Sequence, residues 1–219
     1  MAQNAGNAKN ILVGASPLFI SNIDSTVSGY ATYENSEPGT TNAGAFVTGT
    51  SYTDTLNAKD SGTFYYRNVG FTNNGLQITY NPTYDSVTVD QLLDTAKLFK
   101  SAMEVMIATE MSEGTLENVL IVFGQKKSTL SGGTLGLEAG ALGAAPTERQ
   151  LIAIGNAPTV TGPTTERVYY ARRVLSVQQS QFTLARNTPT TFPVTFRLLP
   201  DAAYTGSEYG KIIDRSWTA

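Results

Sequence analysis

The order of apolar and polar positions in residues 69–124 predicts several β-strands followed by a single helix. Asn73-Asn74-Gly75 predicts a hairpin turn, because Asn-Gly readily takes the positive φ angles that tight hairpins need. Pro82 is expected to end the next strand, because it has no N–H for the ladder. The strands themselves are indicated by two-residue alternation at three sets of apolar positions: Leu76, Ile78, Tyr80; Val87, Val89; and Met103, Val105, Ile107, Met111.

A helix is expected directly after these strands. Thr115 is a suitable N-cap, and Gly124 is a suitable stop after the last turn. The apolar residues between them have the spacing of one helical stripe: Leu116, Val119, Leu120 and Phe123.

The rest of the chain has the alternation of β-structure. Strands are expected within residues 9–20, 151–154, 166–178, 192–198 and 209–215. A helix competes for 166–178, but its valine and tyrosine content favours a strand with Val168, Tyr170, Arg172 and Val174 on one face. The prediction is a mainly β domain of two packed antiparallel sheets, forming a β-sandwich or partial barrel with one flanking α-helix.

Two stretches interrupt this pattern within the single domain expected for residues 1–219. Residues 23–62 are rich in Thr, Ser, Asn, Gly and Ala, and we interpret them as an assembly arm or a long surface loop. Residues 126–147 are rich in glycine. They lack the Gly-Lys-[Ser/Thr] ending of a phosphate-binding loop, which favours a flexible hairpin insertion.

The composition excludes several kinds of catalytic and metal-binding site. The chain has no cysteine and no histidine, so thiolate catalysis, cysteine-type zinc sites and a Ser–His–Asp triad are excluded. Serine–lysine or two-carboxylate chemistry stays open in principle, but no motif for it is present. We expect no enzyme activity, no catalytic residue, no cofactor and no metal.

The charge is distributed unevenly. Residues 1–124 hold 5 Lys and Arg against 12 Asp and Glu, whereas residues 125–219 hold 10 against 6. The overall charge of −3 disfavours electrostatic DNA binding, and the asymmetry suits head-to-tail association of unlike surfaces. No apolar run has the roughly 20 residues that span a bilayer, and MAQNAGNAKN does not have the pattern of a signal peptide. We therefore expect no membrane partner and no Sec-dependent export.

Several of these segments, in their order, resemble the major tail tube proteins of long non-contractile-tailed bacteriophages (siphophages). The resemblance misses most of residues 23–62 and 126–147 and includes the strand at 103–111. The other segments that carry it are VGFTNNGLQITY, YDSVTVDQ, TLENVLIVFG, ERVYYARRV, FPVTFRLLPD and YGKIIDR.

The resemblance implies a structural virion protein. Members of this family form hexameric rings whose sheets join into an inner β-barrel, and the rings stack by helical assembly into the tail tube. The tube is the conduit for DNA ejection into the host. Implied partners are other copies of the chain, a tape-measure protein, tail terminator and baseplate or tip proteins, and genomic DNA in transit. The implied location is the phage tail, with assembly in the host cytoplasm.

Candidate site residues follow from this implied assembly. An acidic lumen repels phosphates, so DNA slides without sticking. Arg172 and Arg173 are candidates for a subunit interface, or alternatively for ion pairs within one subunit. The candidates for the lumen are polar residues of the predicted strands and turns: Gln77, Thr79, Asp85, Asp90, Glu104 and Glu110.

Two alternative functions remain open. One is a tube protein of a contractile tail or a secretion apparatus, which shares the implied fold. The other is a monomeric carbohydrate-binding β-sandwich, in which some of the 11 tyrosines and Trp217 would stack on sugar rings. Tyr65, Tyr66, Tyr169 and Tyr170 lie within strand patterns, which favours packing roles for these four.

Overall fold

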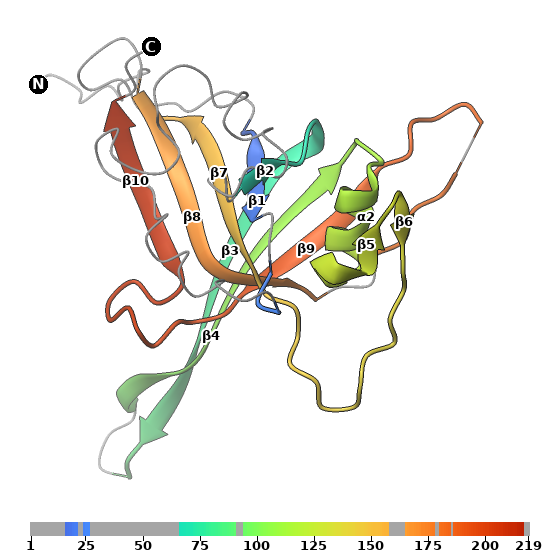
Figure 1. The fold of residues 1–219 in the computed structure, drawn as a ribbon. Coiled ribbons are helices and arrows are strands. Elements are labelled where there is room, and N and C mark those ends of the chain that lie inside the picture. Colours follow the sequence, from blue (N-terminus) through green and yellow to red (C-terminus); the bar gives the residue numbers. More distant parts are fainter. Residues whose placement is uncertain are drawn as a thin grey trace, which may run out of the picture.

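The computed structural model describes residues 16–21, 24–26, 66–90, 94–157, 165–177, 180–184 and 186–216. Within this part of the chain the protein is mainly β, with one α-helix, and the expected fold class is confirmed (Figure 1). The elements are β1 (Leu18–Ser21), β2 (Tyr66–Asn68), β3 (Thr72–Thr88), β4 (Thr95–Met111), α2 (Leu116–Val122), the 3₁₀ helix η3 (Lys127–Thr129), β5 (Leu130–Ser131), β6 (Thr134–Leu135), β7 (Arg149–Asn156), β8 (Thr165–Ser176), β9 (Phe192–Leu198) and β10 (Gly210–Ser216).

Eight strands form one antiparallel sheet in the order β2-β1-β7-β8-β9-β4-β3, with β10 also paired to β8. Ala171 of β8 pairs with Gly210 of β10, and Val174 of β8 pairs with Leu198 of β9. Because β7 occupies the other edge of β8, β9 and β10 share one edge. In Figure 1, β8 runs beside β10 and then bends toward β9. The sandwich-like packing therefore comes from two arms of one sheet that are joined through β8. One arm consists of β2, β1, β7 and β8 with β10, and the other consists of β9, β4 and β3.

The two arms enclose a common hydrophobic core. Leu18, Leu151 and Val174 from one arm contribute to the same buried cluster as Ile107 and Phe196 from the other. A second cluster lies on the opposite face of β1 and β7, since neighbouring strand residues point to opposite faces. Its members are Phe19, Tyr66, Ile152, Ile154, Val168, Tyr170 and Ile213. Burial on both faces explains why β1 and β7 are apolar at consecutive positions.

Helix α2 begins and ends as the sequence predicts. The Thr115 side chain accepts a hydrogen bond from the Asn118 N–H at 3.2 Å, and Gly124 follows the helix with φ 63°. The predicted apolar stripe is wrong in part. Leu120 is buried and Val119 is partly buried, but Leu116 and Phe123 are exposed. The inward face instead consists of Asn118, Leu120, Ile121 and Val122.

The buried amide of Asn118 accounts for this rotation of the helix. Its Nδ2 donates to the carbonyl oxygens of Val69 and Glu113, each at 2.8 Å, and its Oδ1 accepts from Arg67 at 2.6 Å. Pairing a buried amide in this way is required, since leaving its donors and acceptor unsatisfied is costly. These bonds turn the Asn118 side of α2 inward and leave Leu116 at the surface.

The predicted hairpin at Asn73-Asn74-Gly75 is wrong. Asn74 and Gly75 do have positive φ angles, 60° and 69°, but β3 continues through them. The register passes from Asn73↔Glu110 to Gln77↔Ala108, so β3 holds extra residues opposite β4 and forms a bulge. Thr109 stabilises the bulge by donating its hydroxyl to the Gly75 carbonyl at 2.8 Å.

The predicted strand end at Pro82 is also wrong. Pro82 lies within β3 and pairs in register with Met103. It is tolerated because β3 is the last strand of the sheet and has a neighbour on one side only. The runs around Ile78 and Val87, predicted as separate strands, are therefore one strand of 17 residues, and Val89 follows its end.

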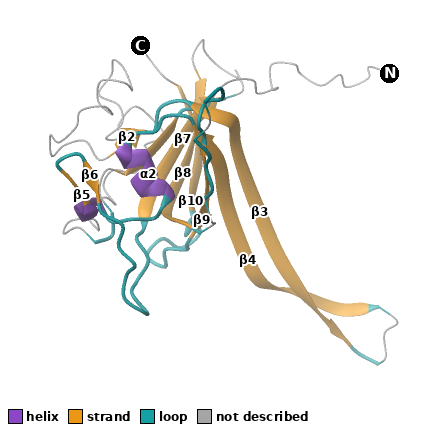
Figure 2. Ribbon diagram, turned by 90° about the vertical axis from the view of Figure 1, so that its right-hand side faces the viewer, coloured by secondary structure: helices purple, strands orange, loops and turns teal. Residues whose placement is uncertain are grey.

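The β3–β4 hairpin extends beyond the rest of the sheet. Both strands have 17 residues, yet β9 pairs with β4 only from Met106 to Met111. The remainder of the hairpin is a two-stranded ribbon that projects away from the body (Figure 2). Helix α2 lies on the other side of the body from this ribbon.

The other segments predicted from the sequence agree with the structure in most of their bounds. The bounds of β7, β8, β9 and β10 are close to those predicted, and β8 is a strand rather than a helix. The single face predicted for β8 is wrong in part, because Val168 and Tyr170 lie in one core cluster and Val174 in the other. The first predicted strand is described only from Ser16 onward, and β1 begins there at Leu18. The predicted arm at 23–62 lies outside the described residues except for 24–26. The 126–147 insertion contains η3 and the small hairpin β5–β6, with Gly132 and Gly133 at positive φ in its turn.

Candidate assembly surface

Most of the residues predicted to line a lumen lie on one side of β3 and β4, the side that carries mainly polar residues. The pairs Gln77↔Ala108, Thr79↔Met106 and Asn81↔Glu104 place these side chains on the face opposite buried Val105 and Ile107. Alternation along the two strands adds Asp85 and Glu110 to the same face. We call this surface the polar face: Gln77, Thr79, Asn81, Thr83 and Asp85 of β3, with Glu104, Met106, Ala108 and Glu110 of β4. Asp90 lies apart from it, in the turn that follows β3.

The charges of the polar face are partly compensated. Glu104 lies 3.7 Å from Arg197 of β9, which alternation brings to the same side of the sheet. Glu110 accepts a weak hydrogen bond from Asn73 at 3.4 Å. The surface is therefore less acidic than the net charge of residues 1–124 suggests. Arg197 was missed at the sequence level, although its place between inward-facing Phe196 and Leu198 already indicates an outward side chain.

The projecting ribbon carries large apolar side chains that the protein does not cover. Tyr80, Tyr84 and Leu98 are 65%, 58% and 64% exposed, and they lie on the face that is buried further along the hairpin. Val87 and Phe99 are 43% and 46% exposed on the polar-face side. Exposed apolar residues gathered on one projecting element are typical of an interaction surface.

Three strands lie at open edges of the sheet among the described residues: the short β2, which has β1 as its one neighbour, and the longer β3 and β10. Strands β3 and β10 each have one hydrogen-bonded neighbour, β4 and β8 respectively. An open edge is a template for pairing with another strand, so soluble proteins usually shorten or protect it. β3 is long, and its protective residues within the strand are few: Pro82 and Asp85.

Arg172 and Arg173 lie where β8 passes from β10 to β9, and both hold the loop 199–209 that joins those strands. The buried Arg172 guanidinium lies 3.5 Å from the centroid of the Tyr204 ring, and its Nε donates to the Ser207 carbonyl at 3.1 Å. Arg173 binds Glu148 through two contacts of 2.7 Å and donates to the Pro200 carbonyl at 3.1 Å.

The contact of Arg173 with Glu148 corresponds to the alternative of an ion pair within one subunit. Arg172 instead contacts the Tyr204 ring and the Ser207 carbonyl of the loop. Arg172 is enclosed by its own chain, whereas the Arg173 side chain is about one-third exposed. Arg173 is thus the better placed of the two for an additional contact with a neighbour. A role at a subunit interface stays a prediction for both.

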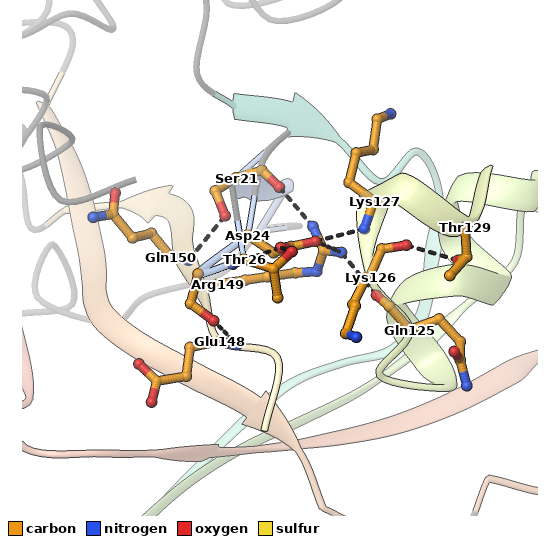
Figure 3. A network of polar contacts seen from close by, with 11 residues as sticks. Ser21, Asp24, Thr26, Gln125, Lys126, Lys127, Thr129, Glu148, Arg149 and Gln150 are labelled. Carbon is orange, nitrogen blue, oxygen red and sulfur yellow. Dashed lines mark hydrogen bonds and ion pairs between the residues drawn. The ribbon is translucent and has the colours of Figure 1, made fainter. Parts of the chain in front are cut away.

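A buried polar network joins the start of the predicted arm (residues 23–62) to the start of the glycine-rich insertion (residues 126–147) (Figure 3). The Asp24 carboxylate is fully buried and accepts hydrogen bonds from Lys127 N–H and from the backbone and side chain of Thr26. It also pairs with buried Arg149 at 3.2 Å. Arg149 donates further to the carbonyl oxygens of Ser21 and Gln125, at 3.4 and 3.1 Å. Asp24 therefore ties the chain after β1 to η3 and β7.

Arg67 and Asp214 lie outside this network, and each has a pKa shifted by its surroundings. Burial lowers the pKa of Arg67, which contacts Asn118, to about 10, although nearby Glu117 acts in the opposite direction. On the surface, Arg167 of β8 makes two contacts of 2.6 Å with Asp214 of β10, and these hydrogen bonds lower the pKa of Asp214 below its usual value. Both pairs join neighbouring elements and indicate structural roles.

The described residues contain no group of three or more His, Cys, Asp or Glu side chains that could hold a metal ion. No helix in this part of the chain is long and apolar enough to span a membrane. The chain matches no model of a known protein family, and no curated protein matches its sequence.

Proposed function

We propose that this chain is a structural protein that polymerises with copies of itself, as stacked hexameric rings, into a phage tail tube that conducts DNA. The observation that carries the proposal is the β3–β4 hairpin. It combines an open 17-residue edge, uncovered apolar side chains and an opposite polar face. In a monomer this combination is unfavourable, because the hairpin exposes apolar surface and an unpaired strand edge to water.

The polar face suits the wall of a DNA conduit. It presents mainly uncharged polar residues such as Gln77, Asn81 and Thr83, with Glu104 neutralised by Arg197. A wall without a positive patch gives the phosphate backbone few partners, so DNA passes without being held. The acidic side chains Asp85 and Glu110 add repulsion rather than attraction.

The alternative of a sugar-binding monomer has less support. Tyr66 and Tyr170 are buried in the core, so they offer no stacking surface for a sugar ring. Tyr80 and Tyr84 are exposed, but they lie on a ribbon rather than in a pocket.

The proposal is tested by the size and shape of the purified protein. We expect light scattering to give a mass of many subunits and negative-stain electron microscopy to give rings or tubes with a central hole. The variant Leu142→Ser serves as a control, because Leu142 is fully exposed away from the hairpin and its loss should leave assembly unchanged. A monodisperse 23.4 kDa particle at all concentrations would contradict the proposal.

A further inference from the structure

A recess of about 460 Å³ lies where β3 begins and β4 ends, at the opposite end of the hairpin from its turn. This volume is within the range of sites that hold small ligands. Three segments far apart in the sequence line it: Ser16 and Pro17 before β1, residues between Asn68 and Thr72, and Glu113 after β4. The recess is therefore separate from the polar face and from the projecting ribbon.

The Glu113 carboxylate has a fixed position in this recess. Its Oε1 accepts a hydrogen bond from the Phe71 N–H at 3.0 Å. The carboxylate lies directly over Gly70, where an added Cβ would come within 2.3 Å of its carbon and both oxygens. Gly70 also has φ 85°, so two separate constraints favour glycine there. A carboxylate accepts about four hydrogen bonds, and Glu113 forms no ion pair within the described part of the chain, so it can accept further bonds from a ligand.

The Phe71 side chain lines the same recess and is 80% exposed. Its backbone is held on both sides, because its N–H donates to Glu113 and its carbonyl accepts from the Ser112 N–H at 2.8 Å. The ring is thus presented to solvent by an ordered piece of chain rather than packed in the core. An aromatic ring beside a carboxylate is suited to a cation, since the face of the ring and the carboxylate both attract positive charge.

The charged groups around the recess have a negative balance. Glu113, Glu117 and Arg149 all lie near enough to Arg67 to act on its charge, and Arg149 is paired with Asp24. Two positive groups therefore face three negative ones in this region. An anion such as phosphate finds no free positive partner among these groups, whereas a cation at Glu113 makes the balance neutral.

We infer that this recess binds the side chain of an arginine presented by another polypeptide chain. A guanidinium is planar, so it can stack on the Phe71 ring while it donates to the Glu113 carboxylate. The Ser16 hydroxyl donates to the Ile154 carbonyl at 3.1 Å, and its oxygen can accept from the same guanidinium. A metal ion is less suitable, because the recess offers one carboxylate and the described residues contain no group of three or more possible metal ligands. The inference is independent of the proposed tube, since it specifies a ligand and not how copies of the chain assemble.

The probe for this site is N-acetylarginine amide, whose blocked ends leave the guanidinium as its one charge. We expect saturation-transfer NMR to give a dissociation constant of about 1 mM, because the probe makes one aromatic and one charge-assisted contact. The control probe is N-acetylcitrulline amide, which has a similar shape and no charge, and it should bind at least about tenfold more weakly. Saturation transfer detects a bound probe on a single chain and on an assembly alike, so the measurement does not require tubes.

Variants of the chain test the two contacts separately. Glu113→Gln keeps an acceptor for the Phe71 N–H but removes the charge, and it should weaken binding of the arginine probe by about tenfold. Phe71→Leu removes the ring from an exposed position, so it should weaken binding about three- to fivefold and leave thermal unfolding unchanged. The matched control is Glu117→Gln, which removes a nearby carboxylate that does not line the recess and should change binding by less than about twofold.

Equal weakening by Glu113→Gln and Glu117→Gln would show that the probe responds to the general negative charge, and the recess would not be the site. A parent protein that binds the citrulline probe as tightly as the arginine probe, or binds neither, would also overturn the inference. If Glu113→Gln does not fold, Phe71→Leu decides, and unchanged binding in that variant contradicts the site. A parent that stays monomeric and binds the arginine probe contradicts the tube alone, whereas tubes that do not bind it contradict this inference alone.

Discussion

Asp24, Asn118 and Arg172 are buried polar side chains that each join segments far apart in the sequence. Asp24 connects the chain after β1 to η3 and β7, and Asn118 connects α2 to the chain on either side of β3 and β4. Arg172 holds the loop between β9 and β10 against β8. Their partners satisfy the polar groups that burial removes from water, so each residue fixes one arrangement of its neighbours.

Removing the Asp24 carboxylate should strongly destabilise the protein. Asp24→Ala leaves buried Arg149 without its partner, and breaking a buried pair in this way costs about 3–5 kcal/mol. Urea unfolding measures the change. The matched control is Asp214→Ala, which removes the surface partner of Arg167 and should cost no more than about 1 kcal/mol. Equal losses for the two variants would show that the Asp24 pair is not buried.

The inward face of α2 is tested by a pair of leucines. Leu120→Ala should lower the free energy of unfolding by about 2–5 kcal/mol, because the residue is 2% exposed and its loss leaves a cavity. Leu116→Ala removes the same atoms from an exposed site four residues earlier, and its cost should be below about 1 kcal/mol. Large losses for both variants would restore the stripe predicted from the sequence, in which Leu116 and Leu120 are both inward.

At the scale of whole elements, alternation was a reliable guide where one face is buried. Strand β9 has inward Phe192, Val194, Phe196 and Leu198 as predicted. In β8 the prediction is correct for Val168 and Tyr170, which share one cluster, but Val174 lies in the other cluster with Ala171, because the register with β7 shifts between Arg149 and Leu151. The other errors fall on β3. Asn74-Gly75 correctly indicates positive φ, but a local signal does not say whether the chain reverses or bulges. A proline would end an interior strand, and only the sheet order shows that β3, which contains Pro82, lies at an edge.

The candidate surface was predictable to a similar degree. Alternation alone brings Gln77, Thr79, Glu104 and Glu110 to one face, as the register then shows. The pairing of Glu104 with Arg197 was not predictable, because it depends on β9 lying beside β4, a contact between residues far apart in the chain. The exposure of Tyr84 and Leu98 likewise depends on how far β9 extends, which no local pattern records.

Strands β1 and β2 lead to a prediction about the segment between them. Ser21 pairs with Tyr66, so the chain leaves and re-enters the sheet at neighbouring positions. Replacing residues 28–64 by a short Gly-Ser linker should therefore preserve the fold and change the unfolding free energy by no more than about 1 kcal/mol, because loop-closure entropy varies slowly with length.

The control for this shortening extends the deletion to residues 24–64. It removes Asp24 as well, so it should be much less stable than the shorter deletion. Circular dichroism with urea unfolding measures both variants. Loss of folding in the shorter deletion would show that residues 28–64 belong to the core rather than to an arm.

At the scale of the whole molecule, the features of the surface agree with one another. An open edge, an apolar ribbon and an uneven charge distribution each suit contact between unlike surfaces of identical chains. The polar face lies on the opposite side of the hairpin sheet from the core. When such sheets join around a ring, that face is the one available to line a channel.

The most direct test of the account is the structure of the assembled particle by electron cryomicroscopy. We predict a hollow tube in which Gln77, Thr79 and Glu110 line the channel. A tube whose channel is lined by α2 and the β5–β6 hairpin, with the polar face of β3 and β4 turned outward, would contradict the account.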